Sequence, residues 1–535
     1  MKERLIIIPA VKKNVVFSDD LIKKLDGILL IQRAIDKAKK IEIVENILVL
    51  TDSEEISMIC ERNGVRKFYD DSMELRDNDI LAFSKPFASY GKDNTNILVL
   101  WPYAPLVTAD VINSAYEEFI ANSYEGIVSV KGTRHEYVLG EDGELNRAAN
   151  GDKKFFVSVK AFLIYKTKVV LNSDCVKWQP YVIDEGRLEI KDYHDWWVCE
   201  KLLKRRRIVF RVIGNKEVGM GHIYRALTLA HENIDHEVIF VCDKESQLVV
   251  DKIAGLEYPL EVSSASKIED TIIKLRPDLV INDILDTDKK YIQKLKNEGI
   301  RVVNFEDLGS GSNIADLTFN ELFDDRLIKG KNIRWGNKYS LLRNEFDEAC
   351  QHKFKSEVKS VLVTFGGSDS SGLTLKVLHA IVPFCKENGV KIQVVVGPGF
   401  TKRIELARLI KSFDYNGINL TSRTGIMSSI MEKTPIAIAS NGRTVYELAH
   451  MNIPSIIVAH HEREDTHLFA QEKNGFINMG MYKEKESDKK ILELLEKLCF
   501  DTEYRKFLFE NMQGYNFLAN KQRVMNEILN LLKNE

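Results

Sequence analysis

The feature that most constrains the fold is an alternation of short apolar runs with amphipathic helical patterns, which continues along almost the whole chain. The apolar runs at 4–9, 207–213 and 360–365 have the length of strands, and each one starts a new series of strand and helix patterns. A strand, a crossover helix and a second strand together form the repeating unit of parallel α/β proteins. The sequence therefore predicts an α/β protein built on parallel sheets.

The expected elements fall into three series. The first predicts strands at 4–9, 46–51 and 96–100 and helices at 30–40, 53–63, 108–122 and 193–203. The second predicts strands at 207–213, 237–242, 279–283 and 301–305 and a helix at 221–231. The third predicts strands at 360–365, 391–396, 435–440 and 454–459, helices at 373–388, 402–413 and 443–451, and a helical tail from 488 to 532.

Chain length and one basic run suggest where the domains divide. A chain of 535 residues is long enough for about three domains of typical size. The run Lys204–Arg207 separates the first series from the second, and we interpret it as a solvated linker rather than a nucleic-acid patch. We predict one domain at 1–205, a second at 206–348, and a third at 349–535 that includes the helical tail.

Composition excludes several classes of protein. The 76 basic and 79 acidic residues leave a net charge of −3, which gives no electrostatic reason to expect nucleic acid or an anionic membrane as a partner. The seven cysteines form no C-x-x-C pair, which argues against a disulfide framework and a structural zinc site. No apolar stretch reaches the roughly 20 residues that span a bilayer. We therefore expect a cytoplasmic protein without membrane insertion.

The first loop with chemical potential follows the strand at 207–213. Gly219 and Gly221 allow backbone amides to approach a ligand closely, and the helix that begins here favours an anion such as phosphate. His222 stands on the first turn of that helix, where it can act as a general base. Arg225 lies one turn further on and can hold a phosphate or carboxylate. The alternative is a helix cap with an incidental histidine, and the combined pattern favours a functional site.

A second polar loop follows the strand at 360–365. It contains Gly366, Gly367, Ser368 and Asp369, and small and hydroxyl residues at the carboxyl end of a strand suit a diphosphate. The alternative is a tight turn in which Asp369 caps the next helix.

A third polar turn follows the strand at 435–440. Ser440 and Asn441 form the turn, and Glu447 on the next helix can accept hydrogen bonds from the vicinal hydroxyls of a ribose. An exposed helix glutamate is an equally good interpretation. Asp283 and Asp307 end two further apolar strands, where ligands bind in open α/β sheets, and for each a capping or turn role is as plausible.

Histidines and carboxylates cluster after the strand at 454–459. His460, His461 and His467 lie close to Glu462, Glu464 and Asp465 in the sequence. Metal binding is conceivable, but without a clear metal-ligand spacing we favour a polar loop that faces substrate or caps a helix. We predict no metal site here.

Several segments of the second half carry a specific resemblance. They are FRVIGNKEVGMGHIYR from Phe210, Asp283 after its strand, FEDLG at Phe305–Gly309, FNELF at Phe319–Phe323, YSLLRNEF at Tyr339–Phe346, FGGSD at Phe365–Asp369 and SNGRTVYEL at Ser440–Leu448. From about 207 to 480 the chain resembles the UDP-sugar hydrolases of pseudaminic acid biosynthesis, the PseG family. That family shares the two-Rossmann GT-B architecture of MurG-type glycosyltransferases.

The resemblance implies a reaction and roles for residues. The family removes UDP from a 2,4-diacetamido-trideoxy sugar by inverting attack of water on the anomeric carbon, without a metal. Its catalytic histidine falls on His222, and we predict Asp283 as the second catalytic residue. The residues that the resemblance and the loops together predict to bind nucleotide or substrate are Gly219, Gly221, Arg225, Asp307, Asn320, Gly366, Gly367, Ser368, Asp369, Ser440, Asn441, Glu447 and His461.

The chain departs from that family on the sugar side. It has Ile213 where members carry Asp, and Ile284 and Leu285 where they carry a His-Tyr pair. It has His461 and Glu462 near a family Asn-Gln pair. The resemblance therefore implies a retained UDP site and leaves the sugar open.

The first half resembles a second family. LIIIPA at Leu5–Ala10, LDGILLIQRAIDKAK at Leu25–Lys39, TDSEEI at Thr51–Ile56 and WPYAPL at Trp101–Leu106 are similar to cytidylyltransferases that activate nonulosonic acids. The resemblance implies a GT-A-like nucleotidyltransferase domain ahead of the GT-B-like pair. Its CTP loop keeps only Lys12 and Lys13, and Lys191 stands in the metal motif as Glu189-Ile190-Lys191-Asp192. An ammonium opposes a hard cation there, so we predict a degenerate domain with a structural, oligomerising or channelling role.

Four functions stay open from sequence. The leading one is a UDP-sugar hydrolase in nonulosonic acid biosynthesis for surface glycans, with a UDP-sugar as substrate and no cofactor. The others are a GT-B glycosyltransferase, a bifunctional enzyme that also uses CTP with magnesium, and a non-catalytic nucleotide-sugar-binding scaffold. Retention of His222 in an intact loop argues against the scaffold. A homo-oligomer through the first domain is possible.

Overall fold

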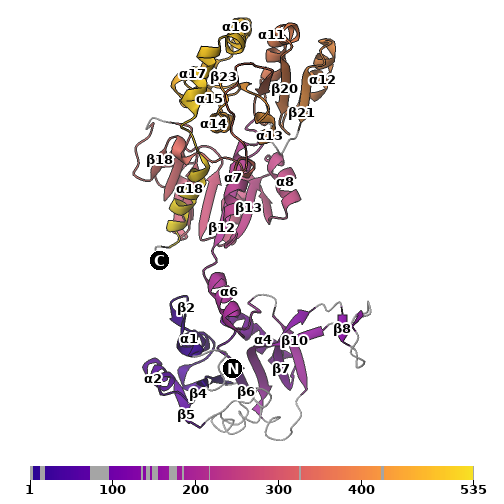
Figure 1. Ribbon diagram of the computed structural model, residues 1–535. Helices are drawn as coiled ribbons and strands as arrows, with labels where there is room; N and C mark the ends of the chain where they lie inside the picture. Colours follow the sequence, from indigo (N-terminus) through magenta and orange to yellow (C-terminus); the bar gives the residue numbers. More distant parts are fainter. Residues whose placement is uncertain are drawn as a thin grey trace. The chain divides into compact units, whose positions relative to one another are not determined.

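The computed structural model divides the chain into two compact units, Met1–Arg205 and Arg206–Glu535 (Figure 1). It describes residues 4–12, 19–72, 96–133, 137–139, 145–147, 155–167, 177–183, 186–215, 217–323, 327–422 and 427–533. Lys13, expected from sequence to survive from a CTP loop, lies outside the described residues.

The first unit contains a mixed sheet, seven-stranded among the residues described. Its order is β11 (Trp178–Val182), β7 (Gly126–Thr133), β10 (Phe155–Lys166), β6 (Asn96–Leu100), β1 (Arg4–Pro9), β4 (Ile47–Thr51) and β5 (Arg66–Tyr69). Strand β10 runs antiparallel to β6 and β7, and the other neighbours are parallel. Two small antiparallel pairs, β2 (Lys24–Leu25) with β3 (Ile28–Leu29) and β8 (Tyr137–Leu139) with β9 (Leu145–Arg147), accompany the sheet.

The helices of this unit follow from local sequence signals. They are α1 (Leu30–Ile41), α2 (Glu54–Asn63), α4 (Ala109–Ala121) and α6 (Tyr193–Leu203). The side chain of Ser53 accepts a hydrogen bond from the Ile56 amide at the start of α2, and Gly64 ends the helix at a φ of 67°. These four helices therefore begin and end within one residue of the predicted bounds, whereas β5, β7, β10 and β11 were not predicted from the sequence.

The second unit begins with a fully parallel sheet. In the described residues its order is β14 (Leu260–Ser263), β13 (Glu237–Asp243), β12 (Arg207–Val212), β15 (Leu279–Asp283), β16 (Arg301–Phe305), β17 (Leu317–Asn320) and β18 (Ile333–Trp335). The helices that connect these strands are α7 (Gly221–Glu232), α8 (Gln247–Ile253), α9 (Ile268–Lys274) and α10 (Lys289–Asn297).

A second parallel sheet completes this unit. Within the described part its order is β21 (Ile418–Ser422), β20 (Lys391–Val396), β19 (Ser360–Thr364), β22 (Ile436–Ala439), β23 (Ser455–Ala459) and β24 (Phe476–Met481). Its helices are α11 (Leu373–Glu387), α12 (Arg403–Ser412), α13 (Met427–Met431), α14 (Thr444–His450), α15 (Glu462–Asp465), α16 (Glu486–Phe500) and α17 (Thr502–Met512).

The strand orders indicate where a ligand would bind in this unit. In both sheets of this unit the chain runs outward from a central strand to one edge, then returns to build the other side, from β12 to β15 and from β19 to β22. The second sheet has the 3-2-1-4-5-6 order of doubly wound folds, and the first sheet has the same order with β18 added as a seventh strand. In such folds ligands bind beyond the carboxyl ends of the strands where the order reverses. The α/β class predicted from sequence is confirmed by the three parallel-rich sheets.

The predicted helical tail consists of the three helices α16, α17 and α18, and the last of them returns to the first sheet of the unit. Helix α18 (Leu518–Asn530) buries Val524, Met525 and Ile528 in the same core as Ile208 of β12, and it lies beside the strands of that sheet in Figure 1. The domain boundaries predicted from the sequence assign this helix to the domain at 349–535. None of the helices in the described residues combines the length and apolar character that crossing a bilayer requires.

Candidate active site

A cavity of about 410 Å³ lies in the second unit between its two parallel sheets. The loops that line it follow β12, β15, β16, β19, β20, β22 and β23 at their carboxyl ends. The residues predicted from sequence that line this cavity are Gly219, Gly221, His222, Arg225, Gly366, Gly367, Ser368, Ser440, Glu447 and His461. Loops from the two halves of the unit therefore meet where the strand orders reverse.

Glycines let these loops come into contact. Gly219 and Gly366 have φ values of +81° and +74°, which L side chains rarely adopt. A Cβ at Gly367 would lie 2.8 Å from the amide nitrogen of Met220 in the opposite loop. A Cβ at Gly221 would lie 2.5 Å from the guanidinium of Arg443. The glycine pattern thus reflects close packing of the two loops as well as room for a ligand.

His222 is held in one orientation by Asp283. The histidine is buried on the first turn of α7, and its Nδ1 lies 2.5 Å from Oδ1 of Asp283 at the end of β15. Because an ionised carboxylate can only accept, Nδ1 is the protonated nitrogen and donates. Its Nε2 is 3.9 Å from Oε2 of Glu306, too far for a hydrogen bond. Nε2 therefore makes no hydrogen bond to Glu306, and it belongs to a residue that lines the cavity.

Arg225 binds three carboxylates. Its Nε lies 2.7 Å from Oδ2 of Asp283, its Nη2 donates to Oδ1 of the same carboxylate, and its Nη1 lies 2.8 Å from Glu306 and 2.9 Å from Glu321. The guanidinium is completely buried. Arg443 adds a second cation 3.6 Å from Glu306. Arg225, which the sequence predicted to hold a ligand, is thus occupied by carboxylates of its own chain.

The pKa values of the carboxyl groups in this cluster are shifted in different directions. Burial acts to raise the pKa of Glu306, but Arg225 and Arg443 outweigh it and hold that pKa well below the usual range. Burial also opposes ionisation of Asp283, and Arg225 and His222 lower its pKa. At Glu321 burial prevails over Arg225, and the pKa rises to about 7. Asp283 and Glu306 are therefore the ionised members at neutral pH.

Backbone strain marks the same edge of the sheet. Leu285 after β15 and Glu306 after β16 have φ values of 67° and 53°, although neither is glycine, and both line the cavity. Residues held in the left-handed region cost of order 1–3 kcal/mol each and cluster at functional sites. The strain is an independent indication that this edge serves a ligand.

The opposite side of the cavity carries a second charged pair. Nε of Arg343 donates to Oε1 of Glu447 at 2.9 Å, and the guanidinium lies over the ring of Tyr224 at 5.3 Å. Burial acts against the charge of Arg343, but Glu447 and Glu345 raise its pKa. Glu447, which the sequence predicted to bind a ribose, lines the cavity. Its Oε1 already accepts a hydrogen bond from Arg343.

Five of the predicted residues do not line the cavity: Asp283, which bonds His222 and Arg225, and four residues that bond the surrounding loops. Asp307 accepts hydrogen bonds from Thr287, Asn304 and Gly309, and its own carbonyl accepts from Asn320. Asp369 accepts from the amides of the first turn of α11, and Asn441 donates to the carbonyls of Glu464 and His467. These side chains hold the loops in place by hydrogen bonds. Asp307 and Asp369 therefore have the turn or capping role that the sequence left open as an alternative to ligand binding.

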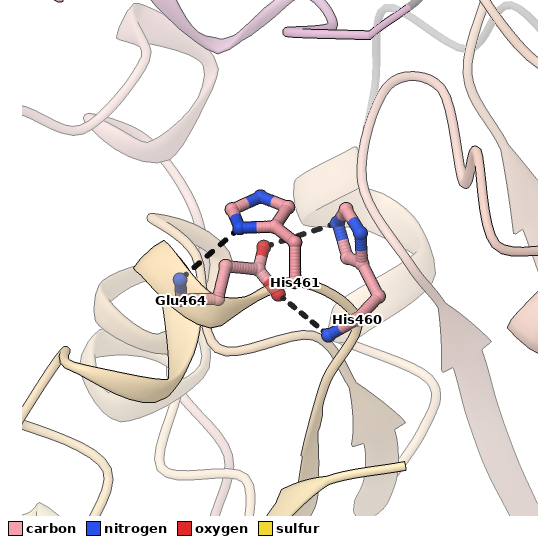
Figure 2. A group of neighbouring side chains, drawn as sticks. All are labelled: His460, His461 and Glu464. Atoms are coloured by element: carbon pink, nitrogen blue, oxygen red, sulfur yellow. Dashed lines mark hydrogen bonds and ion pairs between the residues drawn. The ribbon is translucent and has the colours of Figure 1, made fainter.

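The histidine cluster also faces the cavity. Nε2 of His460 lies 3.3 Å from Oε1 of Glu464, and Nδ1 of His461 accepts a hydrogen bond from the Glu464 amide at the start of α15 (Figure 2). All three residues line the cavity. Burial opposes ionisation of Glu464, but the hydrogen bond with His460 lowers its pKa. His467 is buried beneath and bonds the Asn441 carbonyl through Nδ1.

Five further charged residues belong to the site and were not among the residues predicted from the sequence. Glu306, Glu321, Arg343, Arg443 and Arg463 either line the cavity or bind those that do. Arg463 reaches from α15 to the Glu306 carbonyl at 2.6 Å. The signal in the sequence was the family resemblance, because Glu306, Glu321, Arg343 and Arg443 lie inside the FEDLG, FNELF, YSLLRNEF and SNGRTVYEL segments. Arg463 lies in none of these segments.

In the first unit, a lysine of the predicted CTP loop and the lysine of the predicted metal motif both form ion pairs. Nζ of Lys12 lies 2.8 Å from Glu55 and 2.9 Å from Asp19. Nζ of Lys191 lies 3.6 Å from Glu189, the carboxylate of the predicted metal motif. The lysines that would meet phosphate and metal are therefore engaged by carboxylates.

Comparison with known proteins identifies distant relatives of part of the chain. No family model matches it. A 268-residue match is 30% identical to an uncharacterised protein of Methanocaldococcus jannaschii and covers 46% of this chain and 54% of that protein. Another is 27% identical to the spore coat polysaccharide biosynthesis protein SpsG of Bacillus subtilis, covering 47% and 76%. A third is 27% identical to the UDP-2,4-diacetamido-2,4,6-trideoxy-beta-L-altropyranose hydrolase of Campylobacter jejuni, covering 32% and 64%. The chain thus spans only about half of the first of these relatives.

Solved structures match both parts of the chain. MurG of Acinetobacter baumannii covers 61% of the chain and 99% of its own, with 12% identity and a TM-score of 0.44. A 4-diphosphocytidyl-2C-methyl-D-erythritol synthase of Anaerococcus prevotii covers 38% and 97%, with 12% identity and a TM-score of 0.32. Because both scores are below 0.5, the fold class rests on the strand orders above. The C-terminal region is distantly related to SpsG and to the Campylobacter hydrolase.

Proposed function

We propose that residues 206–535 hydrolyse a UDP-linked amino sugar to UDP and the free sugar. The observation that carries the proposal is the buried His222–Asp283 pair in the wall of a cavity between the two parallel sheets. Asp283 holds Nδ1, and we infer that Nε2 serves as the base. The distant relationship to a hydrolase of a UDP-diacetamido-trideoxy sugar supports the substrate class. The place of such a reaction is the supply of a precursor for nonulosonic acids.

The attack step uses His222 as a general base. Nε2 accepts a proton from water while the water oxygen forms a bond to the anomeric carbon. The bond from that carbon to the diphosphate oxygen breaks, and UDP leaves with the electron pair, so the configuration inverts. Asp283 accepts from Nδ1–H and stabilises the imidazolium that forms, because its carboxylate is ionised through Arg225. This step requires no metal ion.

The glycine loops suit the leaving group. Charge grows on the diphosphate as the bond breaks, and backbone amides aimed at that charge lower the barrier. Gly366, Gly367 and Ser368 line the cavity after β19, and Arg443 adds a guanidinium beside them. Glu447 and Ser440 are the residues that we propose for the nucleoside.

The test is UDP release without acceptor from a panel of UDP-2,4-diacetamido-trideoxy sugars. We expect release by the wild type and by His379→Ala, an exposed histidine of α11, and a loss of about 10²- to 10⁴-fold in His222→Ala. Calorimetry should show UDP bound equally by all three proteins. Release that needs a sugar acceptor would instead assign a glycosyltransferase, and UDP binding without any turnover would assign a binding scaffold.

For the first unit we propose a degenerate nucleotidyltransferase domain. The support is the Lys191 ammonium beside Glu189, which neutralises a carboxylate that a magnesium ion would need. Magnesium-dependent release of pyrophosphate from CTP with a nonulosonic acid would contradict this proposal and assign a bifunctional enzyme.

A further inference from the structure

The cluster of His460, His461 and Glu464 has the composition and spacing of a metal site. One ligand atom from each of the three residues can be chosen so that all lie within 4.8 Å of one another. His460 ends the loop after β23, His461 caps α15, and Glu464 lies on that short helix, so the turn brings all three side chains together (Figure 2). The three side chains therefore come together within one short segment of the chain, residues 460–464.

The separation of two of these atoms fits one shared ion. Nε2 of His460 and Oε1 of Glu464 are 3.3 Å apart. Two ligands that bind one ion tetrahedrally at about 2.0–2.1 Å lie roughly 3.3 Å from each other. The pair therefore needs almost no movement to become two ligands of one metal ion.

Burial supports a site rather than a solvated surface group. The side chains of His460 and Glu464 are each only 8% exposed, whereas His461 is exposed. Nδ1 of His460 is buried and has no hydrogen-bond partner among the described residues. Because Nε2 and not Nδ1 of His460 faces Glu464, the support for a metal ion comes from the grouping of the three residues and from the burial of His460 and Glu464.

We propose that His460, His461 and Glu464 bind a divalent transition-metal ion of the zinc class, whose open coordination positions face the cavity. Two imidazoles and one carboxylate suit zinc, manganese or cobalt better than magnesium, which prefers oxygen ligands. Three protein ligands also leave a position for an outside ligand.

The outside ligand that we propose is an oxygen of the diphosphate, and this part rests on the proposed function. Ser371 of the loop after β19 donates to the His460 carbonyl at 3.1 Å, so the cluster adjoins the loop that we propose for the diphosphate. The ion would bind nucleotide, and His222 would still activate the water. The competing interpretation is a His460–Glu464 ion pair that only orders the loop.

The test measures metal directly on the full chain. Protein stripped with a chelator is dialysed against Zn²⁺, and bound zinc is counted by mass spectrometry. We expect about one ion per chain in the wild type and in Glu462→Gln, an exposed neighbour on the same helix. Glu464→Gln should weaken zinc binding by roughly 10- to 100-fold, since it keeps the shape but loses the charged ligand.

A second variant guards against misfolding. His461→Asn retains a good helix-capping side chain and removes the imidazole, so it should lose zinc while its circular dichroism stays that of the wild type. Co²⁺ should give the visible spectrum of a nitrogen and oxygen site without thiolate charge transfer. Zinc bound equally by Glu464→Gln and His461→Asn, or no zinc retained by the wild type, would overturn the metal site.

Calorimetry with UDP then tests the diphosphate contact. If zinc contacts the diphosphate, zinc should tighten UDP binding to the wild type by about tenfold, and UDP should tighten zinc binding by the same factor. UDP binding to Glu464→Gln should not change when zinc is added. Zinc that binds without affecting UDP would overturn the contact. Zinc binding and UDP release by His222 are separate readouts, so either proposal can fail while the other stands.

Discussion

Replacing Arg225 with methionine should destabilise the second unit strongly. The guanidinium is fully buried and donates to Asp283, Glu306 and Glu321, whose side chains are at most 7% exposed. Methionine has a similar length but no charge, so the ionised carboxylates of Asp283 and Glu306 would remain buried beside the carboxyl group of Glu321. Arg443 lies 3.6 Å from Glu306 and also acts to lower the pKa of Glu321, so it would compensate part of the charge on these two carboxylates.

The expected magnitude follows from the buried charges. Removing one partner of a buried ion pair costs about 3–5 kcal/mol, and here the same partner serves three carboxylates. That is a large share of the roughly 5–15 kcal/mol that stabilises a typical domain. The matched control is Arg334→Met, whose pair with Glu527 is about one third exposed and should cost only about 0–1 kcal/mol.

The loss should also depend on pH. In the wild type the lowered pKa values of Asp283 and Glu306 contribute stability that is present above their unfolded pKa values and is lost as the pH falls. In the variant burial raises these pKa values, so stability instead falls as the pH rises. The difference between the proteins should therefore grow from about pH 4 toward neutrality.

Urea unfolding followed by hydrogen exchange of peptides from 206–535 would measure the effect on this unit. We expect the free energy of unfolding to fall by about 3–5 kcal/mol at neutral pH and by much less near pH 4. A loss below about 1 kcal/mol, or an equal loss at both pH values, would refute the assignment of a buried charge network.

Two further substitutions test the roles of single carboxylates. Asp283→Asn should lower kcat for UDP release by about 10²- to 10⁴-fold, because it no longer holds the Nδ1 proton of His222; unchanged kcat would exclude Asp283 as the positioning residue. Glu447→Gln should raise KM about tenfold with little change in kcat if it binds the nucleoside, whereas a fall in kcat alone would move Glu447 to the chemical step.

Local sequence signals predicted many of the elements, although strands such as β7, β10 and β17 were not predicted. Ser53 and Gly64 predict the ends of α2, and β1, β6, β15 and β20 have the bounds that their apolar runs predict. These features depend on residues within one strand or one helical turn, so no distant contact was needed. These elements and the α/β class therefore follow from the chain itself.

Polar residues at strand ends were harder to assign. Asp307 and Asp369 stand in the same kind of position as Asp283, yet they bond their own loops while Asp283 bonds His222. A carboxylate after a strand can cap a turn or serve a site, and the partner that decides between these roles comes from another strand. The local pattern cannot distinguish them.

The sequence by itself determined the parallel sheets, the glycine loops and the position of His222 at the start of α7. Only the tertiary structure brought Asp283, Glu306 and Glu321 around Arg225, from positions 58, 81 and 96 residues away. It also returned α18 to the first sheet of its unit. The reason is physical: helices and strands follow from neighbours in the chain, but a buried charge needs partners from several strands, and these meet only when the sheet has formed.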